Sequence, residues 1–379
     1  MLDKKAWSAR LSTLRSQLRG QKTDGFVLTN NLDQFYLTNF FFYPEESVFL
    51  IHPKGVVCFT RDLYVEPFGA YAPQIKVIGG ENRIQAAVAY ANKLGLKRVG
   101  FDAAKEPYFS GSYMKKNGLV ELPSLISKLR EQKTPDEIKI MRQANRLAYL
   151  AYEYVRPRVK TGMTECEVAA MLEKFMRDHG ATTTSFLSIV CFGENAANPH
   201  HETGERKLKK EDAVLMDFGC IYKGYCSDIT RSWWHGSHAP AEYTKIWNLV
   251  EKARRAGVKK VSIGTATKDV DAAARGVIES AGYGAYFTHR TGHGVGMEVH
   301  ENPCNAADST AILQEGNEKG CFNVQNIKLA AAIIQCSLKG CEVPFIRGDL
   351  RAFLQPQNRK NFANFILSGL LEKPDSKRN

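Results

Sequence analysis

The sequence lacks several features that would assign it to a specialised class. Its nine cysteines include no Cys-x-x-Cys pair, so we predict no disulfide framework and expect reduced thiols in a cytoplasmic protein. No apolar run approaches the length of a membrane span, and the first residues contain no segment long enough for a signal peptide. Internal repeats and low-complexity stretches are also absent. We therefore expect a globular cytoplasmic protein with no membrane partner.

The chain has fewer acidic than basic residues. It contains 40 Asp and Glu and 52 Lys and Arg, which gives a formal net charge of +12. A basic surface can bind nucleic acid through phosphate contacts. Here, however, the basic residues are spread along the chain, and no array of aromatic and basic residues resembles an RNA-binding motif. We interpret the excess as a solvated surface and expect no nucleic-acid partner.

The first third of the chain predicts a small α/β domain over residues 1–131. A chain of 379 residues is long enough for two domains with separate cores. Before residue 131, apolar runs of strand length alternate with helical patterns, as in α/β domains. The strands are expected at 25–29, 47–52, 55–60, 74–79 and 98–102, and the helices at 4–20, 84–95 and 123–130.

A second domain is predicted to begin at residue 132. Thr134 can cap a helix, Pro135 suits its first position, and Glu137 completes a capping box. Further helices are expected at 164–179, 241–257 and 268–281, and strands at 186–193, 212–222 and 225–235. This mixture predicts an α+β domain over 132–316. The remaining segment, 317–379, is a divergent C-terminal segment.

A β-hairpin is predicted where the sequence reads DFGCIYKGYCSDITR, residues 217–231. A two-residue turn at Lys223-Gly224 places Asp217 opposite Thr230, with Asp228 diagonally across the ladder on the same face. Asp217 follows an apolar run, where an unpaired carboxylate is costly. Two converging carboxylates suit a pair of divalent cations. The DFG triplet at 217–219 does not indicate a protein kinase, because the other kinase motifs are missing.

Three histidines lie close together in HRTGHGVGMEVHE, residues 289–301: His289, His293 and His300. Their spacing would suit one helix face, but the glycines between them make a helix implausible. We expect instead a glycine-rich turn that lets the backbone approach a ligand. His200 lies before the hairpin and is a candidate substrate or proton-handling group.

These motifs resemble those of the creatinase, aminopeptidase P and prolidase family, the metallopeptidases with the pita-bread fold. The resemblance extends from about residue 4 to about residue 316. It is carried by five stretches: YLTNF (36–40), KTPDEI (133–138), GMTECEVAA (162–170), the hairpin, and the histidine segment. The resemblance implies a creatinase-like N-terminal domain before a pita-bread domain.

The resemblance also implies a role for each candidate residue. Asp217 and Asp228 match aspartate ligands of two divalent metal ions (Mn, Co or Zn), and His293 matches the imidazole ligand. His200, His289 and His300 match catalytic histidines that bind substrate and assist proton transfer. The implied reaction is hydrolysis of Xaa-Pro bonds in short proline-containing peptides, in a homodimer or higher homo-oligomer.

The sequence departs from the family after Gly316. The family supplies two more glutamate ligands there, whereas this chain offers Gln325 in FNVQN and Asp349 in IRGDL. Glu315 and Glu318 lie nearby without matching either motif. Because the earlier motifs are intact, we hypothesise a frameshift or assembly error near codon 317. Translation of the other two reading frames tests this hypothesis.

Two functional classes follow from the sequence. The first is a metal-dependent Xaa-Pro peptidase of the aminopeptidase P or prolidase type, with two metal ions whose full occupancy depends on the missing ligands. The second is a catalytically inactive pita-bread protein that binds peptides or partners in its cleft.

Overall fold

A computed structural model describes residues 3–305 of the chain. The chain forms two compact units, residues 1–132 and 133–379. The expected C-terminal segment, 317–379, lies outside the described residues.

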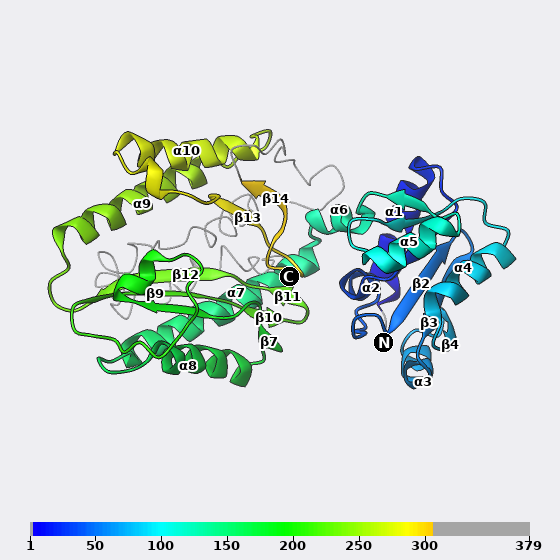
Figure 1. Ribbon diagram of the computed structural model, residues 1–379, viewed down its shortest axis with the longest axis horizontal. Helices are drawn as coiled ribbons and strands as arrows, with labels where there is room; N and C mark the ends of the chain where they lie inside the picture. The colour runs from blue at the N-terminus through cyan, green and yellow to red at the C-terminus, as the bar shows by residue number, and fades with distance from the viewer. Residues whose placement is uncertain (1–2, 306–379) are drawn as a thin grey trace, which may run out of the picture. The chain divides into compact units, whose positions relative to one another are not determined.

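A six-stranded mixed sheet forms the centre of the first unit (Figure 1). Its order is β4-β3-β2-β1-β5-β6, and β2 runs antiparallel to both of its neighbours while the other pairs are parallel. The strands are β1 (Gly25–Leu28), β2 (Ser47–His52), β3 (Gly55–Thr60), β4 (Lys76–Gly79), β5 (Val99–Asp102) and β6 (Val120–Leu122). The five predicted strands are therefore present, together with the short β6.

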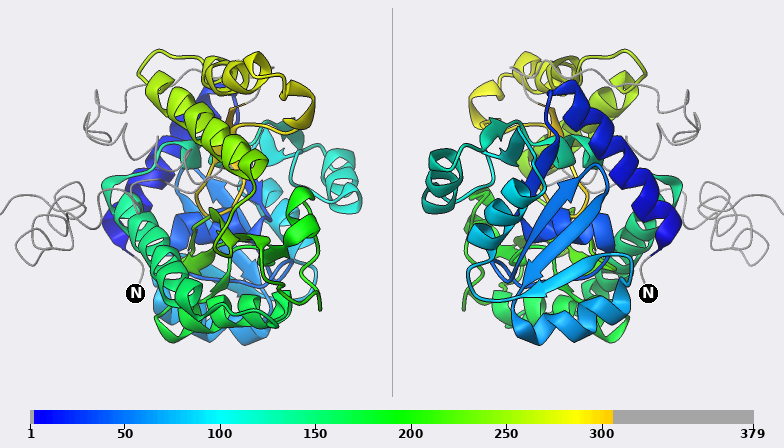
Figure 2. Two further views of the ribbon diagram at one scale, coloured as in Figure 1. Left: turned by 90° about the vertical axis from the view of Figure 1, so that its left-hand side faces the viewer. Right: turned by 90° about the vertical axis from the view of Figure 1, so that its right-hand side faces the viewer.

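Helices cover this sheet, as the right-hand view of Figure 2 shows. They are α1 (Lys4–Gly20), α2 (Asn31–Thr38), α3 (Asp62–Tyr71), α4 (Arg83–Lys93), α5 (Tyr108–Lys116) and α6 (Leu125–Glu131). Val27 and Leu50 pack with Ala87 of α4 and Met114 of α5. Phe49, the neighbour of Leu50, instead stacks on Phe68 of α3 at 5.8 Å. Alternate strand residues thus build two apolar layers, and this unit is an α/β domain.

Two helices and two small sheets begin the second unit. The helices are α7 (Pro135–Val155) and α8 (Glu165–Asp178), and each starts with a capping box, the predicted one at Thr134 and another at Thr164. One sheet has the order β12-β9-β8 and the other β11-β10-β7. Their strands are β7 (Thr183–Thr184), β8 (Ile189–Phe192), β9 (Asp212–Phe218), β10 (Cys220–Tyr222), β11 (Tyr225–Cys226) and β12 (Ile229–His235).

Strand β9 separates two different environments. Val214, Met216 and Phe218 are buried in a core with Tyr152 of α7 and Leu172 of α8. Successive strand residues point to opposite faces, so residues 213, 215 and 217 project from the face that looks away from these helices. The alternation therefore places Asp217 on the face opposite the core.

The second unit continues with a helix pair and a short hairpin. Helices α9 (Ala241–Lys260) and α10 (Thr267–Ser280) pack together through Ala253, Ala274 and Ile278. Strands β13 (Gly292–Gly294) and β14 (Glu301–Asn305) pair antiparallel. Figure 1 shows the chain running from α10 into β13. The unit is α+β, as predicted.

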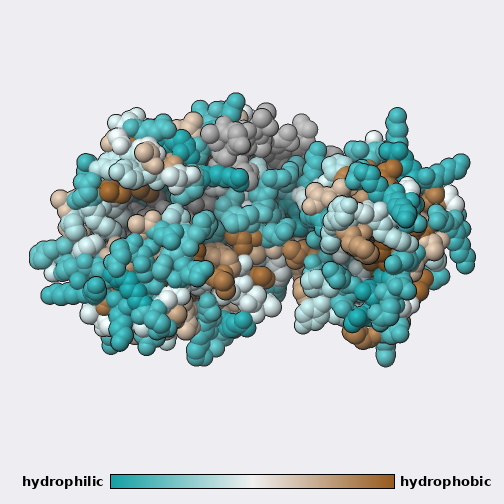
Figure 3. Space-filling model, in the orientation of Figure 1, coloured by the Kyte–Doolittle hydropathy of each residue, from teal (hydrophilic) through white to brown (hydrophobic). Residues whose placement is uncertain are grey.

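The surface seen in Figure 3 is mainly hydrophilic on each unit, with hydrophobic residues in small separate groups. A helix long and apolar enough to cross a membrane does not occur within residues 3–305.

Candidate functional site

The hairpin has the predicted register. Tyr222 pairs with Tyr225 across the turn, and Lys223 and Gly224 both have positive φ, 49° and 84°, as a two-residue hairpin turn with the right twist requires. Thr230 consequently lies opposite Asp217.

The ladder is, however, interrupted beside Asp228, which corrects the continuous hairpin that we predicted. Gly219 lies outside both β9 and β10, and Ser227 and Asp228 lie between β11 and β12. Ser185 enters this gap: its N–H donates to the Gly219 carbonyl at 3.1 Å, and its hydroxyl donates to the Ser227 carbonyl at 2.7 Å. A side chain at Gly219 would begin 1.9 Å from the Ser227 carbonyl oxygen, so only glycine fits.

Asp217 is held by its partner across the ladder. Its side chain is buried, with the residue 3% exposed, and the Thr230 hydroxyl donates to its Oδ1 at 2.8 Å. This bond fixes the orientation of the carboxylate and satisfies one of its oxygens.

Asp228 meets the histidine segment. His293 lies on β13, and its Nε2 is 3.4 Å from Oδ2 of Asp228, which is 8% exposed. The rings of His293 and His300 meet edge to face with centroids 4.1 Å apart. Burial acts to lower the pKa of His293, but the Asp228 carboxylate and the Gly294 and Val299 carbonyls outweigh it and raise this pKa above its usual value. The structure thus brings together Asp228, His293 and His300.

Two glycines of the histidine segment leave room for other parts of the chain. His293 lies on a short strand, not in a turn. A side chain at Gly294 would lie 2.7 Å from the Glu301 carbonyl oxygen, and one at Gly296 would lie 2.3 Å from the Glu301 carboxylate. That carboxylate accepts hydrogen bonds from Lys133 and from the Met297 amide, both at 2.9 Å. Gly294 and Gly296 therefore leave room for β14 and for the Glu301 carboxylate.

His200 and His289 occupy loops. His200 is exposed and follows a 3-10 turn, where its N–H donates to the Asn198 side chain at 3.1 Å. The His289 ring meets the Phe287 ring edge to face with centroids 5.3 Å apart. Within the described part of the chain, neither makes a hydrogen bond or ring contact with the other four predicted site residues.

A buried carboxylate that we did not predict, Glu165, organises the loop that carries His200. Its two oxygens accept hydrogen bonds from the Phe192 amide, the Asn195 side chain, His201 Nε2 and the Gly204 amide, at 2.8, 2.8, 2.8 and 3.1 Å. Burial acts to raise the pKa of Glu165, and these donors together lower it below its ordinary value. Glu165 lies in the GMTECEVAA stretch, but nothing in one sequence indicates that this glutamate is buried.

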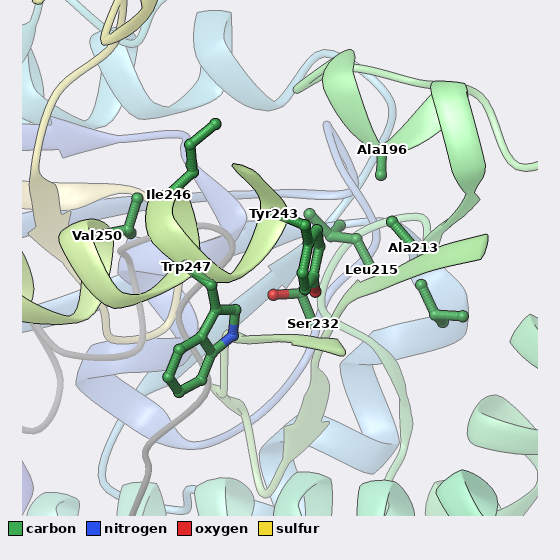
Figure 4. A pocket seen from close by; sticks show the side chains of 9 residues that line it. Ala196, Ala213, Leu215, Ser232, Tyr243, Ile246, Trp247 and Val250 are labelled. Carbon is green, nitrogen blue, oxygen red and sulfur yellow. The ribbon is translucent and has the colours of Figure 1, made fainter. Parts of the chain in front are cut away.

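A mostly apolar cavity of about 220 Å³ is lined by residues of β9, β12 and α9 (Figure 4). Ala213 and Leu215 of β9 and Ser232 of β12 line one side of it. The other side is formed by residues of α9: Tyr243, Ile246, Trp247 and Val250.

Comparisons with known proteins agree with this geometry. The model of metallopeptidase family M24 matches residues 139–318, and that of the creatinase/prolidase N-terminal domain matches residues 10–132. A peptidase of Bacillus subtilis is 34% identical over 315 residues, which cover 81% of this chain and 88% of the relative. The chain belongs to the M24 metallopeptidases.

Solved structures of similar sequence support the same assignment for this M24 metallopeptidase. An Xaa-Pro dipeptidase from Bacillus anthracis is 35% identical, with a TM-score of 0.77 and coverage of 81% of this chain and 87% of that one. An X-Pro aminopeptidase from Thermotoga maritima is 26% identical, with a TM-score of 0.71 and coverage of 79% and 87%. The second unit is therefore a pita-bread domain, as predicted, and the protein belongs to a family of peptidases.

The donors suit the divalent metal ions that are general in this family. Carboxylates and an imidazole are ligands that Mn, Co or Zn accept, and Asp217, Asp228 and His293 provide these types. Residues 3–305 nevertheless contain no group of three His, Cys, Asp or Glu side chains placed to hold a metal ion. Gln325 and Asp349 lie outside the described residues, as do Glu315 and Glu318. The described donors thus fit in kind, and their number falls short of a complete site.

Proposed function

We propose that this M24 metallopeptidase hydrolyses Xaa-Pro bonds in short proline-containing peptides. The observation that carries the proposal is the contact between Asp228 and His293, which joins the hairpin to the histidine segment. Similarity to an Xaa-Pro dipeptidase and an X-Pro aminopeptidase supports the substrate class.

The chain's own residues would divide the work as follows. Asp217, Asp228 and His293 would hold divalent cations, which supply a lowered pKa for the attacking water when bound. His289 and His300 would hold the peptide and the negative charge that develops on the carbonyl oxygen, while His200 moves a proton. His300 is exposed and touches His293, so it lies where it can reach a peptide bound at the proposed metal ligands.

The proposal also includes the identity of the metal ion and the oligomeric form. We propose Mn, Co or Zn as the ion and a cytoplasmic homodimer or higher homo-oligomer as the working form. Gln325 or Asp349 would replace the missing glutamates if two ions bind.

A peptide panel tests the proposal. The purified full-length chain is incubated with Mn, Co or Zn and with Ala-Pro, Ala-Pro-Ala or Ala-Ala-Ala, and products are followed by chromatography. We expect cleavage before proline only. Cleavage of Ala-Pro-Ala but not Ala-Pro identifies an aminopeptidase P, and cleavage of Ala-Pro identifies a prolidase. Equal cleavage of Ala-Ala-Ala, or no cleavage with any ion, contradicts the proposal.

A second candidate is a non-catalytic peptide-binding protein. It is favoured by the absence of a three-ligand group within residues 3–305 and by Gln325, which the resemblance aligns with a glutamate of the family. Binding of Ala-Pro-Ala without cleavage in the same panel, detected by calorimetry, would support this candidate.

A further inference from the structure

An ion pair between a buried aspartate and a partly exposed arginine on α10 lies next to the segment that carries His289. Asp271 is 0% exposed, and Arg275, one helical turn later, donates to it through Nε at 2.8 Å and through Nη2 at 3.3 Å. A buried carboxylate needs such partners, because an unpaired one is strongly destabilising.

Arg275 also binds the backbone on both sides of residue 288. Its Nη1 donates to the Phe287 carbonyl at 2.8 Å, and its Nη2 donates to the His289 carbonyl at 3.0 Å. The guanidinium carbon lies 4.5 Å from the centroid of the Phe287 ring. One planar group therefore binds Asp271, the aromatic ring and two carbonyls, which requires the fork geometry of arginine.

Asp271 binds the other end of the same segment. The Thr291 amide and hydroxyl both donate to its Oδ1, at 3.0 and 2.5 Å, and Thr291 is fully buried. Residues 287–291 belong to neither a helix nor a strand, so these bonds to α10 take the place of a ladder. Thr291 lies two residues before His293.

We propose that Asp271 and Arg275 are positioning residues that fix the backbone of His289 relative to His293. The pair binds the carbonyl of His289 on one side and Thr291 on the other, so the intervening chain has one arrangement. The inference rests on the proposed function in one respect, namely that His289 contacts the peptide. A displacement of about 1 Å in such a group can lower a rate about 10²-fold.

The test compares Arg275→Lys with a matched control, Arg255→Lys. Arg255 also bonds a carboxylate one turn away, Glu251, with Nε to Oε1 at 2.6 Å. Lysine keeps the charge in both variants but loses the fork. Asp271→Asn serves as a second variant that removes the charge and leaves the side-chain volume nearly unchanged.

Two readouts separate the outcomes. Amide hydrogen exchange of residues 287–293 should accelerate about tenfold or more in Arg275→Lys, while exchange in α7 and α8 stays at the wild-type rate. The control should change neither region. With Ala-Pro-Ala as substrate, kcat should fall about 10–100-fold while KM changes less than about threefold.

Exchange in residues 287–293 that is unchanged in both Arg275→Lys and Asp271→Asn overturns the inference. An equal rise across α7 and α8 also overturns it, because the pair would then support the fold in general. Local acceleration in a protein that never cleaves any peptide supports the positioning role and contradicts the proposed function.

Discussion

Thr230 lies opposite Asp217 in the antiparallel ladder and donates its hydroxyl proton to the Asp217 carboxylate at 2.8 Å. The relationship follows from the turn at Lys223-Gly224, which sets the register of the whole hairpin. A two-residue turn thus determines which hydroxyl supports a predicted metal ligand six residues away.

Removing the Thr230 hydroxyl should destabilise the second unit. Thr230→Val keeps the shape but removes a hydrogen-bond donor from the buried Asp217 carboxylate, which should cost about 1.5–3 kcal/mol. Thr230→Ser keeps the hydroxyl and should cost about 1 kcal/mol or less. Urea unfolding of the three proteins measures the difference. Equal losses in Val and Ser would mean that the hydrogen bond contributes no more to stability than the methyl group at this position.

Gly219 should tolerate no side chain. The Cβ of Gly219→Ala would lie 1.9 Å from the Ser227 carbonyl oxygen, so the two strands must separate beside Asp228. We expect a loss of at least about 2 kcal/mol, read from the thermal or urea midpoint. Gly276→Ala, in α10 with open space around it, is the control and should gain about 0.5–1 kcal/mol. A Gly219→Ala protein as stable as wild type would show that the two strands can separate beside Asp228 without loss of stability, which contradicts this prediction.

Glu165 should contribute stability in a defined pH range. Its folded-state pKa lies below the ordinary value of 4.5, so the contribution is fully present above about pH 4.5 and is lost as the pH falls through the folded-state pKa. Glu165→Gln replaces one hydrogen-bond-accepting oxygen by an NH₂ group that faces the same donors. This change should lower the free energy of unfolding by about 2–4 kcal/mol at neutral pH. The difference from wild type should shrink below pH 4.5.

Unfolding by urea between pH 3 and pH 8 measures this dependence. Glu167→Gln on the same helix is the control, because a glutamine oxygen can still accept the bond from the Thr164 amide that Glu167 accepts at 2.7 Å. A wild-type advantage over Glu165→Gln that stays constant down to pH 3 would contradict the assigned pKa direction.

Local patterns in the sequence predict much of the fold. The capping box at Thr134 and the turn at Lys223-Gly224 are both as predicted, since each depends on a few adjacent residues. Helices α2, α3 and α5 were not predicted. They are short, and α3 contains Pro67, so their helical pattern is weak and tertiary packing decides them.

The candidate site is less predictable because its decisive contacts join distant segments. The Asp228–His293 contact agrees with both being site residues, but neither the gap beside Gly219 nor the insertion of Ser185 has a local signal. Glu165 and Asp271 look like ordinary helix-surface acids in the sequence. Glu165 and Asp271 are buried and accept hydrogen bonds because loops from distant parts of the sequence pack against them.

Metal binding tests the central claim, that Asp228 and His293 form one site. The full-length chain is loaded with Mn, desalted and assayed for bound metal by mass spectrometry, beside Asp228→Asn, His293→Gln and the control His179→Gln. His179 is exposed and stacks on Phe175 in α8. We predict at least about one Mn per wild-type and control chain, with affinity lowered by about 10–100-fold or more in both site variants. Equal Mn content in all four proteins, or none in the wild type, would contradict the account.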